Sequence, residues 1–161
     1  MATTKQILEQ QFTLIKKELI EKHIELGMKA SGKWINELEV ESTNEMGRII
    51  GMHYTKQLVS GRKAYPGDRS KTPPIEAIKQ WIKDKGISSR VKGEAGITSF
   101  AWAIARTIQQ KGTRYFQQGG TDLIDAVITP ARMQKVINLV GKELTYTLVT
   151  KVENEFKKMT A

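Results

Sequence analysis

The stretch from Ser60 to Gly112 limits the possible folds more than any other part of the sequence. It begins with a basic loop over residues 61–72, which holds two glycines and one proline and has no hydrophobic periodicity. Thr72, Pro73 and Pro74 then predict the start of a helix, because threonine caps a first turn well and proline lacks only an N–H that this turn leaves unpaired. Gly86 is the expected end of that helix. The middle of the chain should therefore hold a helix between two loops.

A second loop and a second helix complete this unit. Residues 87–97 contain two glycines and are predicted to be a mobile basic loop, like residues 61–72. The next helix should start at Thr98 or Ser99 and end at Gly112, and its alanines would allow another helix to come close. Helical spacing predicts two buried faces: Ile75, Ile78, Trp81 and Ile82 on the first helix, and Phe100, Ala103, Ile104, Thr107 and Ile108 on the second.

The N-terminal part predicts one long helix and a small sheet. Over residues 4–30, apolar residues recur at the spacing of one helical face: Leu8, Phe12, Ile15, Leu19 and Leu26, with His23 on the same stripe as an expected boundary residue. Residues 35–44 alternate apolar and acidic side chains, which is typical of a half-buried strand. A turn at 44–47 and a partner strand at 48–52 should follow. Residues 53–60 fit either a strand or a helical turn.

The C-terminal part predicts a loop, a short helix and a long helix. Residues 114–121 read as a loop with a Gly119-Gly120 hinge, and residues 122–128 as a short helix. Thr129 and Pro130 repeat the cap-and-proline start. From there, apolar residues keep helical spacing for about seven turns, although residues 144–150 have strong β-propensity: Met133, Val136, Ile137, Val140, Leu144, Leu148, Val152 and Phe156.

These elements together predict the fold class. We expect an α+β protein with a long N-terminal helix, a small antiparallel sheet, two central helices and a long C-terminal helix. A length of 161 residues predicts a single domain over residues 1–161.

Positive charge is concentrated in the middle of the chain. Residues 61–93 hold nine Lys or Arg against three Asp or Glu, which is +6 of the net charge of +9. Such a concentration favours phosphate or acidic partners, and an ordinary solvated surface is the alternative. The expected partner-facing or DNA-facing residues are Arg62, Lys63, Arg69, Lys71, Arg90 and Lys92.

The sequence offers no recognisable catalytic motif. It contains no cysteine and only two histidines, so it predicts neither a thiolate nor an imidazole metal site. Nucleotide-binding and nucleophile-elbow patterns are missing, and so are an apolar leader and an apolar run long enough to cross a membrane. We therefore expect a non-enzymatic protein with no cofactor, no metal and no membrane contact.

The central pattern resembles small neck and tail-completion (head–tail joining) proteins of tailed bacteriophages. The resemblance covers residues 50–115, and one loop departs from it because Lys63-Ala64-Tyr65 lengthens the segment before Pro66. The residues that carry it are Tyr54, Gly61-Arg62, Pro66-Gly67, Pro73-Pro74, Trp81, Gly86, Phe100-Ala101, Ile104-Ala105-Arg106 and Gly112-Thr113.

This resemblance implies a virion structural protein. Members of that family work as homo-oligomeric rings between the capsid portal and the tail, so the implied partners are further copies and neighbouring neck, portal-adaptor or tail-tube proteins. Non-specific contact with packaged DNA is also implied. The implied location is the virion neck, after assembly in the host cytoplasm. The alternative hypothesis is a small basic nucleic-acid-binding module without enzymatic activity.

A ring needs two different contact faces on each subunit. The outer face of the N-terminal helix is one candidate, with its lysines opposite the acidic strand face of the next copy. The residues expected at this interface are Lys16, Lys17 and Lys22 on one side and Glu37, Glu39 and Glu41 on the other. The other interpretation is that this helix packs only on the core of its own subunit.

Overall fold

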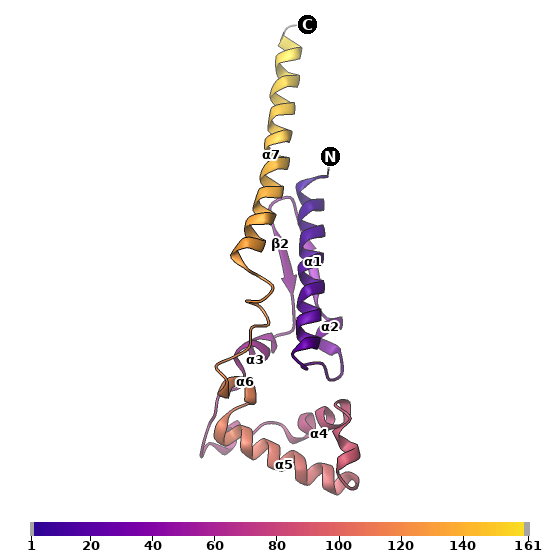
Figure 1. The fold of residues 1–161 in the computed structure, drawn as a ribbon, viewed down its shortest axis with the longest axis vertical. Coiled ribbons are helices and arrows are strands. Elements are labelled where there is room, and N and C mark those ends of the chain that lie inside the picture. Colours follow the sequence, from indigo (N-terminus) through magenta and orange to yellow (C-terminus); the bar gives the residue numbers. More distant parts are fainter. Residues whose placement is uncertain (1, 160–161) are drawn as a thin grey trace.

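The computed structural model describes residues 2–159 as an elongated, mainly helical molecule. One antiparallel sheet of two strands accompanies the helices, which confirms the α+β prediction. Figure 1 shows a hairpin of helices at one end of the molecule and the long helix α7 (Pro130–Met159) projecting at the other. Between them lies a body formed by α1 (Thr4–Glu25), the sheet and the first part of α7.

Helix α1 starts at a capping box. Thr3 Oγ1 accepts a hydrogen bond from Gln6 N at 3.3 Å, and Gln6 Oε1 accepts one from Thr3 N at 2.8 Å. The helix ends at Glu25, five residues before the predicted end, because Gly27 takes a φ of +67° that stops it.

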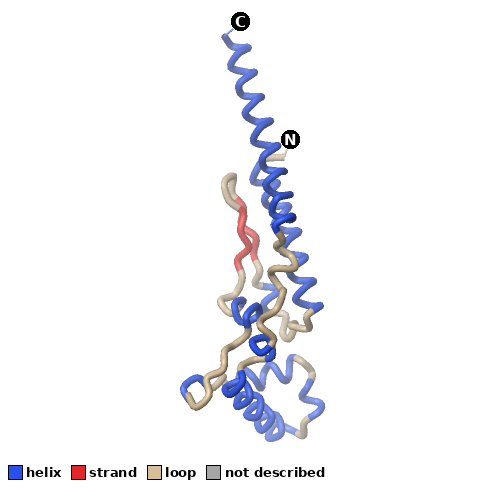
Figure 2. The backbone as a smooth tube through the Cα atoms, turned by 60° about the vertical axis from the view of Figure 1, so that its left-hand side comes forward, coloured by secondary structure: helices blue, strands red, loops and turns tan. Residues whose placement is uncertain are grey.

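The predicted strand at 35–44 is too long. Residues Lys33–Asn36 form a short helix, α2, and Glu37 caps its end, so β1 covers only Glu39–Ser42. This helical turn places Trp34 in the core, where it is 4% exposed. The strand can therefore begin only after the turn. The alternation itself is confirmed, since every second residue of β1 and β2 (Gly47–Ile50) is half-buried and the others are exposed. They pair with Val40 opposite Ile49, beside α1 (Figure 2).

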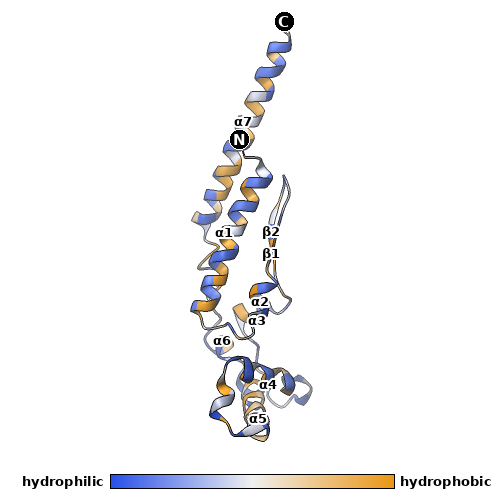
Figure 3. Ribbon diagram, turned by 90° about the vertical axis from the view of Figure 1, so that its right-hand side faces the viewer, coloured by the Kyte–Doolittle hydropathy of each residue, from blue (hydrophilic) through white to orange (hydrophobic). Residues whose placement is uncertain are grey.

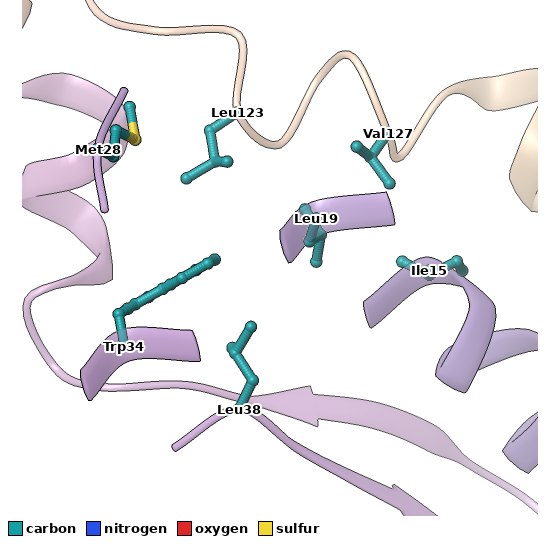
Figure 4. Close-up of a cluster of buried hydrophobic side chains, with 7 residues drawn as sticks. All are labelled: Ile15, Leu19, Met28, Trp34, Leu38, Leu123 and Val127. Atoms are coloured by element: carbon teal, nitrogen blue, oxygen red, sulfur yellow. The ribbon is translucent and has the colours of Figure 1, made fainter. Parts of the chain in front are cut away.

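The body is held by one apolar cluster. Two residues of the predicted α1 stripe, Ile15 and Leu19, lie at its centre. Figure 4 shows how side chains from α1, the loop after it, α2, the residue before β1 and the segment before α7 point toward one another: Ile15, Leu19, Met28, Trp34, Leu38, Leu123 and Val127. The stripe of α1 therefore packs on the core of its own chain.

The segment before α7 is not the short helix predicted over residues 122–128. It is a series of turns that still buries Leu123 and Val127 against α1. Thr121 holds this segment to the body, because its N–H donates to Val59 O at 2.7 Å and its Oγ1 donates to Leu58 O at 2.9 Å. Tertiary anchoring replaces helical continuity here.

Residues 53–60, which the sequence left open, form a short helix. Helix α3 (Thr55–Ser60) begins where Thr55 Oγ1 donates to Met52 O and accepts from Trp34 Nε1, at 2.6 and 2.9 Å. It packs against α6 (Arg114–Gln117), a helical turn inside the predicted loop 114–121.

A second, separate apolar cluster lies in the helical hairpin. Helices α4 (Ile75–Asp84) and α5 (Gly93–Lys111) are joined by the 3₁₀ turn η2 (Ile87–Arg90). The cluster consists of Ile78, Ile82, Ile97, Ala101 and Ala105. Ala101 and Ala105 are fully buried, as expected for alanines that let two helices approach closely. The single domain predicted from length stays a prediction.

Both predicted helix starts in this hairpin are wrong. Pro74, not Thr72, precedes the first helical residue, and Thr72 instead closes the 3₁₀ turn η1 (Arg69–Lys71). Helix α5 begins at Gly93, so residues 93–97 of the predicted mobile loop 87–97 are helical. Thr98 lies inside the helix, where its Oγ1 donates to Glu94 O at 2.9 Å.

The predicted buried faces need correction. Trp81 is 40% exposed, and Phe100, Ala103 and Thr107 are exposed as well. The buried side of α5 instead follows Ile97, Ala101 and Ala105, one position round from the predicted phase. Because alanines bring the helices close, the seam has room for isoleucine side chains but not for an indole ring.

Helix α7 is continuous through the β-prone residues 144–150, as its apolar spacing predicted. Thr129 caps its start by accepting from Arg132 N at 3.1 Å. The first part packs on α1, where Val136 is buried and Arg132 Nη2 contacts Glu18 Oε1 at 2.8 Å. Every residue described from Lys151 onward is exposed.

Two substitutions in α4 test the corrected phase. Ile82→Ala should lower the free energy of unfolding by roughly 2–5 kcal/mol, because it empties a fully buried position. Trp81→Ala should lower it by less than Ile82→Ala does, since Trp81 is already 40% exposed to solvent. Urea denaturation of both variants measures the difference. Equal losses of unfolding free energy in the two variants would mean that Trp81 is a core residue, as the sequence predicted.

Acid should weaken the fold through His23, which lies buried and stacked on Trp34 with ring centroids 4.5 Å apart. Burial lowers the pKa of His23 below its ordinary 6.5, and the nearby charge of Lys85 lowers it further. The unfolded chain therefore takes up this proton first, so stability is complete above the unfolded pKa and declines as pH falls below it.

Denaturation at about pH 7.5 and about pH 5.5 measures this decline. His23→Phe keeps an aromatic ring against Trp34 but cannot titrate, and should show a smaller loss over the same interval. An identical pH dependence in the variant would assign the acid sensitivity to other groups.

Candidate binding surfaces

The basic loop 61–72 is anchored to the end of α5. Arg62 N donates to Thr113 Oγ1 at 2.9 Å, and Thr113 N donates to Arg62 O at 2.9 Å. A Cβ on Gly61 would lie 2.2 Å from Phe116 N, and one on Gly112 would lie 2.6 Å from Phe116 Cδ1. Only glycine allows backbone and ring to approach so closely. We call Gly61, Arg62, Gly112, Thr113 and Phe116 the clasp.

Further hydrogen bonds shape the loop beyond the clasp. Tyr65 N donates to Gln109 O, and Gln109 Nε2 donates to Asp68 O, both at 2.7 Å. The hydrogen bond from the Ser70 hydroxyl is the main cause that lowers the pKa of Asp68. The Arg62 guanidinium donates to Lys71 O at 2.6 Å. Arg62 is half-buried and closes the loop, so this predicted partner-facing residue has a structural role.

The other predicted basic residues of this loop are exposed. Lys63, Arg69 and Lys71 point to solvent at the C-terminal end of α5. Lys111 and Arg114 flank the clasp and are exposed too, although sequence reasoning missed both of them. Their one sequence signal was the Gly112-Thr113 pair between them. We call Lys63, Arg69, Lys71, Lys111 and Arg114 the clasp group.

Arg90 and Lys92 do not join this group. They lie in and just after η2, at the other end of the hairpin, and α4 alone is about 15 Å long. Other charges near η2 are partly neutralised, since Glu94 contacts Lys83 at 3.0 Å and Lys79 at 3.7 Å. The hydrogen bond from Lys83 lowers the pKa of Glu94.

Several residues of the predicted subunit interface have partners within the chain. Lys22 contacts Asp122 at 3.2 Å and Glu25 at 3.3 Å, and the hydrogen bond to Asp122 raises its pKa. Lys17 lies 3.9 Å from Glu21, and Lys16 is half-buried.

On the acidic side of this interface, Glu41 accepts from Arg48 Nε across the hairpin at 2.8 Å. Glu37 and Glu39 are exposed, but Glu37 lies before the strand. The acidic face is therefore smaller than predicted, and its role between subunits stays a prediction.

No catalytic arrangement stands out in the part of the chain that the structure describes. Residues 2–159 hold no group of three or more His, Cys, Asp or Glu side chains placed to bind a metal ion. Among these same residues, no helix is sufficiently long and apolar to cross a membrane. Two open hollows of about 260 and 470 Å³ lie on α7.

Among the described residues, α7 carries more exposed large apolar side chains than any other element. Eight of its large apolar side chains are each at least 45% exposed. Five of them lie within about 40° of the line through Leu148 around the helix, and we call these five the α7 stripe: Ile137, Leu144, Leu148, Val152 and Met159. Three aromatic side chains are also exposed on the helical hairpin: Trp81, Phe100 and Trp102. These side chains are candidates for contacts with other molecules.

Comparison with known proteins gave no match for this chain among family models, curated proteins or solved structures.

The clasp is testable with paired glycine substitutions. Gly112→Ala should destabilise the fold by more than the roughly 1–2 kcal/mol that a left-handed backbone costs alanine, because the new methyl meets Phe116 and Arg62 O. Gly119→Ala is the control, since Gly119 has a φ of +82° but nothing within 4 Å of the position that an added methyl would take. Thermal unfolding of both variants gives the comparison, and equal losses would mean that backbone conformation alone matters.

Proposed function

We propose that this chain is a structural subunit of the neck of a tailed bacteriophage and forms a homo-oligomeric ring at the head–tail connection. The observation that carries the proposal is the clasp. Gly61-Arg62 and Gly112-Thr113 belong to the resembling pattern and are bonded to each other although Arg62 and Thr113 stand 51 positions apart.

Other residues of the pattern also have structural roles in the same unit. Pro73 and Pro74 precede α4, Gly86 ends it, and Ala101 and Ala105 bury the α5 face. Most of the pattern thus lies in one folded unit between the clasp and the end of α5, while Tyr54 packs on the body cluster. This arrangement supports a resemblance of fold over a chance match of composition.

The surface of the chain suits assembly into a larger particle. The aromatic side chains on the hairpin and the α7 stripe leave apolar area exposed on a chain that is otherwise rich in charge. A ring subunit would cover such area with neighbouring copies or neighbouring rings.

The clasp group supplies the charge that this function would use. The loop 61–72 contains one carboxylate, Asp68, which accepts hydrogen bonds from Ser70 N and from the Ser70 hydroxyl. In a neck ring the cations of the clasp group would face packaged DNA or an acidic surface of the adjoining ring.

One feature favours the second candidate, a basic nucleic-acid-binding module. Tyr65 is exposed within the same loop as Lys63, Arg69 and Lys71, and an aromatic ring among cations is a stacking platform for single strands.

Native mass separates the two functions. Light scattering of the purified chain should give a ring of about six or more copies without nucleic acid. A monomer that binds DNA, with an affinity that falls steeply as salt rises, would replace the neck proposal with the nucleic-acid module.

The clasp group should matter for particles and not for folding. Lys63→Gln, Arg69→Gln and Lys71→Gln together should change the free energy of unfolding by less than about 0.5 kcal/mol each, because all three side chains are exposed. In a phage that encodes this triple variant, infectious titre should fall while the native mass of the protein stays unchanged.

Lys5→Gln, Lys29→Gln and Lys33→Gln form the matched control, since these exposed lysines remove the same charge from the body of the molecule. Equal titres for the two triple variants would mean that the clasp group is an ordinary solvated surface without a partner.

A further inference from the structure

The α7 stripe lies on a face of the helix that the chain itself does not use. Val136 is 4% exposed against the body, whereas its neighbour Ile137 is 58% exposed. Leu144, Leu148 and Val152 continue from Ile137 toward the projecting end, where Figure 3 shows apolar residues among polar ones along α7. The fold of one chain therefore leaves this stripe open.

The projecting part of α7 contains a segment of low intrinsic helix propensity. Five of the seven residues at 144–150 are threonine, tyrosine or valine, which are poorer helix formers than alanine or leucine. Most of the stability of helices in proteins comes from tertiary packing of an apolar face rather than from propensity. A contact along the stripe would supply the packing that this segment lacks.

Gly141 also indicates that the stripe is a contact face. It lies in the interior of α7, where glycine costs about 1 kcal/mol relative to alanine. A Cβ at this position would meet nothing within 4 Å, so no contact inside the chain requires a glycine. Gly141 stands seven residues before Leu148 and is therefore on the stripe.

Charge indicates what kind of partner fits. Residues 137–159 hold four lysines and three glutamates, a net charge of +1, whereas the whole chain carries +9. A nearly neutral face with interspersed signs suits neither DNA nor an anionic membrane. It suits another helix of mixed charge, and α7 is such a helix.

The stripe is also symmetric about Leu148. Leu144 and Val152 stand four positions to either side of it, and Ile137 and Met159 stand eleven. Eleven residues are close to three whole turns, so these side chains follow a nearly straight line along the helix. Two antiparallel copies that meet at Leu148 would place an apolar side chain opposite each of the others.

Glu155 decides between antiparallel and parallel pairing. It stands seven residues after Leu148, within the stripe, and its carboxylate contacts Lys158 at 2.7 Å. A parallel pair in register would bring Glu155 against Glu155 of the other copy, a like-charge contact in an apolar seam. An antiparallel pair places it level with Gly141, where the missing side chain leaves room for the carboxylate to reach solvent.

We infer that a second copy of this chain covers the α7 stripe, with the two α7 helices antiparallel and crossing at Leu148. This contact joins identical faces, and so it is distinct from the two different faces that a ring requires. It does not depend on the neck function, and either can fail alone. A ring that also made this contact would occur as a pair of rings.

Disulfide cross-linking tests the arrangement directly, because the chain has no cysteine of its own. In a glutathione buffer, Leu148→Cys should cross-link with itself rapidly. Leu144→Cys and Val152→Cys should each cross-link slowly alone and rapidly when mixed, because disulfides need Cα atoms within about 7 Å. Tyr146→Cys, about 200° round the helix from Leu148, measures random collision.

The same experiment has outcomes that overturn the inference. Rapid self-cross-linking of Leu144→Cys and of Val152→Cys, without gain on mixing, would establish a parallel pair. A Leu148→Cys rate equal to that of Tyr146→Cys would mean that no second copy covers the stripe.

A charge placed at the centre of the stripe should separate the copies. Leu148→Glu should halve the native mass measured by light scattering, whatever other contact the chain makes, and Tyr146→Glu should leave it unchanged. Both side chains are more than half exposed in the single chain, so neither variant should disturb the core. Retention of the parent mass by Leu148→Glu would reject the contact, and a halved mass that is still ring-sized would leave the ring standing.

Gly141→Leu provides an independent test. The substitution should raise the helix content of the single chain, because leucine is the better helix former, yet weaken the pair by crowding Glu155 of the other copy. Tighter pairing of this variant would contradict the antiparallel arrangement, since added apolar volume would then be filling an empty position.

Discussion

The clasp is the contact on which the arrangement of the chain depends. The helical hairpin is connected to the body by two covalent segments, one before α4 and one after α5, and these segments meet at Arg62 and Thr113 through reciprocal hydrogen bonds. Gly61 and Gly112 allow the approach, and Phe116 fills the space beside them. A second tie runs from the Lys85 ammonium to Gly27 O at the end of α1. The hairpin is thereby placed relative to the body without sharing its apolar cluster.

The two apolar clusters differ in how far apart their residues lie in the sequence. The body cluster combines residues from Ile15 to Val127 and so depends on contacts distant in sequence, while the hairpin cluster runs only from Ile78 to Ala105. Short-range contacts form with a smaller loss of chain entropy. The hairpin is thus the more local unit, and the clasp connects it to a body that needs most of the chain to close.

The densest group of positive charges and the α7 stripe lie toward opposite ends of the molecule, although the basic end also exposes three aromatic side chains. The clasp group and Arg90 with Lys92 lie on the hairpin, at one end, and the α7 stripe extends toward the other (Figure 1). Surface ion pairs contribute little to stability, each about 0–1 kcal/mol, so the positive charge of this end adds little to folding. An elongated subunit with different chemistry at its two ends suits an assembly in which each end meets a different neighbour.

Local chemistry let the sequence by itself determine the helix start at Thr129-Pro130, the ends at Gly86 and Gly112, and the alternation in β1, because caps, glycine stops and period-two burial act over a few residues. The sequence also showed that positive charge is concentrated in residues 61–93. Only the tertiary structure decided that Trp81 is 40% exposed, that residues 122–128 are turns, and that Arg62 closes a loop. Each of these outcomes depends on a contact with another part of the chain. The alanines of α5 bring the two hairpin helices close, which leaves no room for Trp81 between them. Thr121 is anchored to α3, and Arg62 donates to the carbonyl of Lys71. Sequence spacing indicates that a residue has a face, but the packing of distant segments decides what that face contacts.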